Sequence, residues 1–247
     1  MHAQPAITAP PLLGRLRPPD VAGIRRRFAA HAALVASRAI DLVLRSPATL
    51  FLLAVITATT IVQIGAGSAA AHHLVVANSS SLRHLRALDL RVLITSAFWL
   101  DSTPLLGLWL VLFLGVLAPA ERWLGTGRWL LVFFCGHIGA TAVTVGGIWI
   151  ATAGGVAGER LEHATDVGVS YGFFAVIAAL ACRMPARWRP AALGALLGSL
   201  TIAWLAGHTF TDAGHLAAAA IGVAVYALAS RGSAPAPAGA PVPVPPR

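Results

Sequence analysis

The chain has little charge and no lysine. Only 11% of its 247 residues are charged, compared with roughly 25% in soluble domains, and all 18 basic residues are arginine. Hydrophobic residues make up 57%, and the mean hydropathy is +0.76. This balance excludes a soluble globular domain, so we expect lipid to cover most of the surface. The exclusive use of arginine, with abundant Ala, Gly and Pro, is typical of a GC-rich bacterial genome.

Cysteines and aromatic residues are also scarce. Cys135 and Cys182 lie in different apolar runs, so we expect no disulfide framework. Aromatic residues account for 7% and do not alternate with the arginines, which lie at the ends of apolar runs and in the N-terminal region. A pI near 11.5 therefore indicates membrane topology and contact with lipid headgroups, and we expect no nucleic-acid partner.

Apolar runs suited to crossing a hydrocarbon core of about 30 Å, which takes ~20 helical residues, recur along the chain. They lie at residues 49–65, 104–120, 129–153, 168–182, 191–207 and 213–229. The sequence thus predicts an all-α membrane protein, with a bundle of six transmembrane helices in residues 48–230. We expect residues 1–47 to form a cytoplasmic tail, disordered through residue 27, with an interfacial helix over residues 28–45. Residues 231–247 are expected to form a disordered Pro/Ala-rich cytoplasmic tail.

Arginines gather in the loops on one side of these predicted spans. They precede the first span, link the second to the third and the fourth to the fifth, and follow the sixth. The opposite loops hold Glu159, Glu162 and Asp166 with only Arg160, and the long first loop, residues 68–103, is the exception with three arginines. Because arginine near span ends marks the cytoplasmic side, we expect a bacterial plasma-membrane protein with both termini in the cytoplasm.

A Gly-x-Ser-x-Gly pentapeptide, residues 168–172, lies at the predicted outer start of the fourth span. In soluble hydrolases this pattern marks a strand-turn-helix elbow, but no strand-like alternation accompanies it here. His215 lies at the outer start of the sixth span, 45 residues after Ser170. One descending and one ascending helix of ~20 residues, with a turn, consume about that length. We therefore expect Ser170 and His215 to lie at similar depth.

A histidine beside a serine can remove its proton and make it a nucleophile. Ionisable groups inside membrane spans are costly, which makes them candidates for function. Either residue alone is explained as well by packing or by a hydrogen bond between helices, whereas the pair favours a catalytic dyad. Small residues after His215, including Ala217 and Gly222, allow another helix to approach closely.

These motifs resemble those of the rhomboid family of intramembrane serine proteases. The resemblance covers residues 48–230 and implies hydrolysis of peptide bonds in membrane-protein substrates, without a metal or organic cofactor. It implies that Ser170 is the nucleophile and His215 the general base and then acid. The matching positions are Gly168, Ser170, His215, Gly222, the Glu-x-x-Leu-Gly sequence at residues 121–125, and residues 91–98 before the second span.

The sequence departs from the family pattern at the positions whose side chains stabilise the oxyanion, the negative charge that develops on the substrate carbonyl oxygen. The family has a His and an Asn in the second span, and the matching positions here are Leu105 and Trp109. Losing one oxyanion donor typically costs about 100 to 1,000-fold in rate. Replacement donors in the sequence are the Trp109 indole, the hydroxyls of Ser102 and Thr103, and the Ser170 backbone N–H. We expect Gly168 to support the oxyanion site and Phe174 to replace the family's aromatic residue that packs on the histidine. The family has Gly directly after the nucleophile, whereas here Tyr171 separates Ser170 from Gly172.

Three other interpretations stay open. The missing His and Asn favour an inactive rhomboid-like protein that binds transmembrane clients. His208, Asp212 and His215 are spaced i, i+4 and i+7, which would place them on one helical face as part of a zinc site. A transporter is disfavoured because no pair of broken spans or buried carboxylates marks an ion path. We expect Asp101 and Glu121, at span ends, to be solvated.

Overall fold

A computed structural model describes residues 21–156, 158, 161 and 163–231. Contacts divide the chain into two compact units, Met1–Asp41 and Leu42–Arg247. The described part of the first unit belongs to helix α1 (Val21–Leu44). The prediction of disorder through residue 27 is therefore wrong for residues 21–27, which are helical. The predicted tails at residues 1–20 and 232–247 lie outside the described residues.

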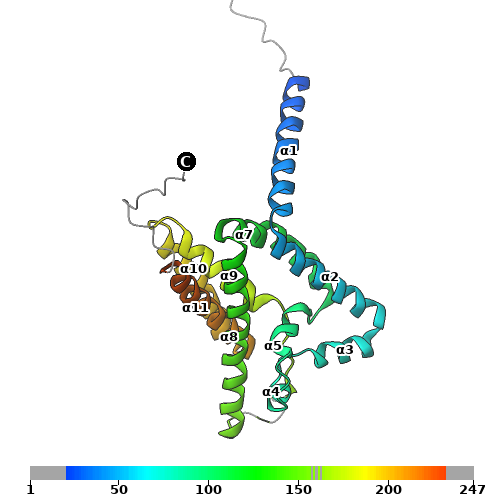
Figure 1. The fold of residues 1–247 in the computed structure, drawn as a ribbon, viewed down its shortest axis with the longest axis vertical. Coiled ribbons are helices and arrows are strands. Elements are labelled where there is room, and N and C mark those ends of the chain that lie inside the picture. Colours follow the sequence, from blue (N-terminus) through cyan, green and yellow to red (C-terminus); the bar gives the residue numbers. More distant parts are fainter. Residues whose placement is uncertain (1–20, 157, 159–160, 162, 232–247) are drawn as a thin grey trace, which may run out of the picture. The chain divides into compact units, whose positions relative to one another are not determined.

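In the second unit, all regular secondary structure of the described residues is helical (Figure 1). Its first part, up to the second predicted span, contains α2 (Pro47–Ala66), α3 (Ser68–Ala77), α4 (Leu82–Arg86), α5 (Val92–Thr95) and η1 (Ser96–Phe98). The second span is built from η2 (Thr103–Leu105), α6 (Leu106–Leu112), the wide turn η3 (Phe113–Leu117) and α7 (Ala118–Leu124). The rest contains α8 (Thr126–Ala153), α9 (Ser170–Arg183), α10 (Arg189–Gly207) and α11 (Phe210–Arg231).

Five of these described segments are long and apolar enough to cross a membrane. They are Pro47–Ala66, Thr103–Leu124, Thr126–Ala153, Arg189–Gly207 and Phe210–Arg231. The predicted all-helical membrane fold is thereby confirmed. The fourth predicted span is instead α9, whose 14 residues extend only about 21 Å at 1.5 Å per residue. Length therefore supports five of the six predicted spans.

Helix α9 packs between α8 and α11 through very small side chains. Ala175 of α9 lies against Gly136 of α8 on one side and Gly222 of α11 on the other. A Cβ atom at Gly222 would lie 2.7 Å from both the Cα and the carbonyl carbon of Ala175, closer than carbon atoms can pack. Glycine at these positions therefore lets three helices meet backbone to backbone, and this contact sets the distance between α9 and α11.

Glu121, in α7, is buried, so the prediction that it is solvated is wrong. Its side chain is 1% exposed. The two carboxylate oxygens accept hydrogen bonds from the backbone N–H groups of Ala48 (3.1 Å) and Thr49 (2.8 Å) at the start of α2. The Thr126 hydroxyl donates a third bond of 2.8 Å. A helix start leaves N–H groups unpaired and carries partial positive charge, so this carboxylate caps α2 and ties it to the α7–α8 turn.

Candidate active site

Ser170 and His215 lie at the starts of two neighbouring helices. Ser170 is the first residue of α9, and His215 lies in the second turn of α11. His215 Nε2 and Ser170 Oγ are 3.0 Å apart and share a hydrogen bond. Both residues are half-buried. The structure thus brings together the two residues that the sequence placed at similar depth.

Two aromatic rings hold the His215 imidazole from the side of α9. The Phe174 ring centroid lies 4.7 Å from that of His215, at an interplanar angle of 56°. The Tyr171 ring lies 5.5 Å away at 72°, in an edge-to-face arrangement. Phe174 follows Ser170 by one helical turn, which is why its ring reaches the same neighbour. Sequence reasoning treated Tyr171 only as an insertion and missed this contact.

The segment before Ser170 is pinned by hydrogen bonds to the long first loop. Gly168 has a φ of +125°, a backbone conformation that residues other than glycine rarely adopt. Its N–H donates to the carbonyl oxygen of Ser96 at 2.8 Å. Two residues earlier, the Asp166 carbonyl oxygen accepts from the backbone N–H and hydroxyl of Ser80, at 3.0 and 2.9 Å. These bonds fix where α9 begins, and so fix the height of Ser170 beside His215.

A second buried polar pair lies beside this segment. His137, in the middle of α8, is 1% exposed, and its Nε2 shares a 3.0 Å hydrogen bond with the Ser96 hydroxyl. The His137 ring also lies 6.1 Å from that of Tyr171. Ser96 therefore links α8 to the Gly168 backbone. A histidine in the middle of an apolar run was the sequence signal for this contact.

Asp166 is a buried carboxyl four residues before Ser170. It is 8% exposed, and its Oδ2 has no hydrogen-bond partner among the described residues. Burial raises the pKa of Asp166 from 3.8 to about 6, against the smaller opposing effect of the Tyr171, Ser80 and Thr144 side chains. The sequence analysis counted Asp166 only as a charge in an outer loop. Its burial could not be predicted, because it depends on segments that are distant in the sequence.

Trp109 and Leu105 lie on the second span. The Trp109 ring packs edge-to-face on Phe173 of α9, with centroids 5.5 Å apart, and on Phe113, 6.4 Å away. Leu105 is 42% exposed at the end of η2. In the part of the chain that the structure describes, the Trp109 indole donates no hydrogen bond, and its ring pairs are with Phe173 and Phe113 rather than His215. The structure thus brings Trp109 against α9 but not into the Ser170–His215 pair.

The zinc arrangement proposed for His208, Asp212 and His215 does not form in the described residues. His208 adopts a left-handed conformation where α10 ends, with a φ of 51°. Asp212 Oδ2 instead accepts a 2.6 Å hydrogen bond from the Thr209 hydroxyl. Among residues 21–156, 158, 161 and 163–231, no group of three or more His, Cys, Asp or Glu side chains is arranged to hold a metal ion.

Comparison with known proteins adds one match. The family model described as rhomboid-like protein matches residues 41–235, which is most of the chain. Neither the curated proteins nor the solved structures contain a significant match. The matched region includes the second predicted span, the Ser170 segment and all of α11.

Proposed function

The chain belongs to the rhomboid-like family, and from this membership and the Ser170–His215 geometry we propose that it is an intramembrane serine protease. The single observation that carries the proposal is the 3.0 Å hydrogen bond between His215 Nε2 and Ser170 Oγ. This distance lies within the range needed for direct proton transfer from a nucleophile to its base. Its substrate is another membrane protein, reached within the lipid bilayer that surrounds the five long apolar helices.

In the proposed reaction, Ser170 Oγ attacks the carbonyl carbon of a peptide bond while His215 Nε2 accepts the hydroxyl proton. This step uses the imidazole tautomer whose proton is on Nδ1. The C–N bond then breaks, and His215 passes the proton to the leaving amine. A water molecule attacks the resulting ester, gives a proton to His215, and releases the new carboxyl group as Ser170 regains its proton. No metal or organic cofactor enters these steps.

Negative charge on the carbonyl oxygen requires donors near Ser170. Ser170 opens α9, so its backbone N–H belongs to the helix-start groups that lack intrahelical partners, and the helix dipole favours negative charge there. The Gly168 N–H already donates to the Ser96 carbonyl oxygen, so it is not a donor to the substrate. Gly168 supports the site instead through its backbone conformation, with a φ of +125°. We assign Phe174 to positioning His215. The Trp109 indole is the proposed additional donor, and Trp109→Phe should then reduce cleavage.

An inactive rhomboid-like protein that binds transmembrane clients is the second candidate. The observation that favours it is the pair Leu105 and Trp109, at positions where the family has hydrogen-bonding His and Asn side chains. The Ser170–His215 hydrogen bond argues for activity instead. In both cases we propose a bacterial plasma-membrane location, with both termini in the cytoplasm.

Labelling with an alkyl fluorophosphonate, which reacts with activated serines, separates these candidates. Purified protein in detergent should be labelled, and Ser170→Ala and His215→Ala should each abolish labelling. Ser199→Ala is the matched control, because Ser199 is exposed on α10 and bonds only its own helix, through the Leu196 carbonyl. A well-folded wild type that is not labelled would favour the inactive candidate.

A further inference from the structure

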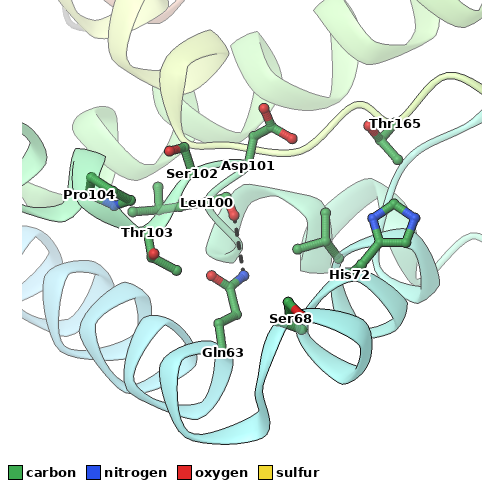
Figure 2. Close-up of a pocket in the computed structure, with 11 residues that line it drawn as sticks. Gln63, Ser68, His72, Leu100, Asp101, Ser102, Thr103, Pro104 and Thr165 are labelled. Carbon is green, nitrogen blue, oxygen red and sulfur yellow. Dashed lines mark hydrogen bonds between the residues drawn. The ribbon is translucent and has the colours of Figure 1, made fainter.

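A polar cavity lies where helix α2 ends (Figure 2). Its volume is 340 Å³, at the lower end of the range for small-molecule sites, about 300–1,000 Å³. In Figure 2 the Gln63 side chain rises from α2 towards Leu100, with Ser68 and His72 of α3 on one side of it. Gln63 is buried, whereas Ser68, His72 and Asp101 are exposed. The cavity therefore has a buried polar floor and an exposed rim.

Gln63 is a buried amide with an unused acceptor. Its side chain is 3% exposed. Its Nε2 donates a 3.2 Å hydrogen bond to the Leu100 carbonyl oxygen, whereas its Oε1 has no hydrogen-bond partner among the described residues. A carbonyl oxygen only accepts, so the bond to Leu100 fixes which end of the amide is left over. A buried acceptor without a partner is costly, and a donor placed beside it removes that cost. The floor of the cavity thus favours a ligand with N–H or O–H groups.

The charge of the lining favours a cation. Asp101 is the one carboxyl among the described residues that line the cavity, and none of them is arginine. The hydroxyls of Ser102, Thr103 and Thr165 add neutral acceptors. A primary ammonium has three N–H donors to divide among such acceptors, and its charge pairs with the carboxylate. A quaternary ammonium carries the same charge without N–H groups, so this lining distinguishes the two.

The cavity lies at the depth of lipid headgroups. Helix α2 has 20 residues and extends about 30 Å at 1.5 Å per residue, which matches the hydrocarbon core of a bilayer. Its last turn therefore reaches the boundary with the headgroups, and Gln63 lies three residues before its end. Within residues 61–66 every residue except Gln63 is exposed. In a bilayer these exposed residues contact lipid, so the headgroup of a phospholipid beside α2 is level with the cavity.

We propose that the cavity lined by Gln63 and Asp101 binds the headgroup of a phosphatidylethanolamine molecule from the surrounding bilayer. The primary ammonium donates to Gln63 Oε1 and to the Asp101 carboxylate, and the Ser68 hydroxyl and the His72 ring at the rim donate to the phosphate. The acyl chains lie along the exposed end of α2, which includes Ile64. This lipid site does not depend on the proposed protease function.

Native mass spectrometry of the delipidated full-length protein tests the proposal with three phospholipids that have identical acyl chains. Phosphatidylethanolamine has the primary ammonium, phosphatidylcholine keeps the charge but has no N–H, and phosphatidylglycerol has no ammonium. The apparent Kd for phosphatidylethanolamine should be at least about tenfold lower than for either other lipid, as expected for a hydrogen bond between charged partners.

Two variants test whether this cavity is the site. Gln63→Leu removes the buried acceptor at similar side-chain size, and Asp101→Asn removes the charge at an exposed position where folding does not depend on it. Each should remove most of the preference for phosphatidylethanolamine. Asp89→Asn is the matched control and should retain it, because Asp89 pairs with Arg91 at 2.9 Å and does not line the cavity.

Equal affinity for phosphatidylethanolamine and phosphatidylcholine would overturn the proposal. A preference retained by either folded variant would also overturn it, because the lipid would then bind elsewhere. Phosphoethanolamine in solution that binds as tightly as the lipid would assign the cavity to a soluble amine instead of a membrane lipid. None of these measurements uses cleavage, so fluorophosphonate labelling of Ser170 tests the protease function separately.

Discussion

Replacing Gly222 with alanine should separate α9 from α11 and stretch the Ser170–His215 contact. The added Cβ would lie 2.7 Å from the Cα and carbonyl carbon of Ala175, whereas carbon atoms pack at about 3.5 Å. The contact is with backbone atoms, so no side-chain rotation relieves it. The two helices must therefore move apart by about 1 Å at this point.

That displacement reaches the reacting atoms because helices are stiff. Gly222 follows His215 by seven residues, about two turns along α11, and Ala175 follows Ser170 by five along α9. If the whole 1 Å is transmitted, the present 3.0 Å bond lengthens to about 4 Å, beyond hydrogen-bond range. A misplacement of about 1 Å costs roughly 100-fold in rate, and overpacking costs about 1–3 kcal/mol in the free energy of unfolding.

The assay compares fluorophosphonate labelling rates and thermal unfolding for wild type, Gly222→Ala and Gly147→Ala. Gly147 lies on α8, and a Cβ there would meet nothing within 4 Å, so this control should match wild type in both measurements. A Gly222→Ala protein that is folded and labelled at the wild-type rate would refute the reasoning. Equal slowing in Gly147→Ala would show that added methyl groups act without separating the helices.

Three other expectations follow from contacts of single side chains. Phe174→Leu should slow labelling roughly tenfold, because the aromatic contact that holds His215 is lost, and an unchanged rate would contradict that role. Glu121→Gln should lower the free energy of unfolding, measured by denaturation in detergent, by about 2 kcal/mol, because an amide nitrogen replaces one acceptor of the α2 cap, whereas an unchanged value would contradict the cap. Burial favours the neutral form of Asp166 and raises its pKa from 3.8 to about 6. The contribution of this carboxyl to the free energy of unfolding is therefore complete below pH 3.8. That contribution, about 3 kcal/mol, is lost as pH rises through about 6. Asp166→Asn should flatten the fall in stability between about pH 4 and 6, the interval between those two pKa values, and parallel pH curves would contradict the assignment.

Hydropathy along the chain was enough to predict an all-helical membrane fold. Burying about 20 consecutive apolar residues in lipid depends on each residue's own transfer free energy, so five long spans could be recognised one by one. The 45-residue interval between Ser170 and His215 likewise follows from helix length alone. The polar motifs and the resemblance they carry were also visible in the sequence, and the match over residues 41–235 agrees with them.

Packing between distant segments decided the rest. Helix α9 is short because the chain before Ser170 is bonded to Ser80 and Ser96 of the first loop, which satisfies backbone groups without a helix. Glu121 is buried because the start of α2 supplies its N–H donors, and Asp166 is buried where the sequence showed only a loop charge. Hydropathy assigns a value to each residue, but the stability of a buried polar group depends on partners that only the folded chain brings to it.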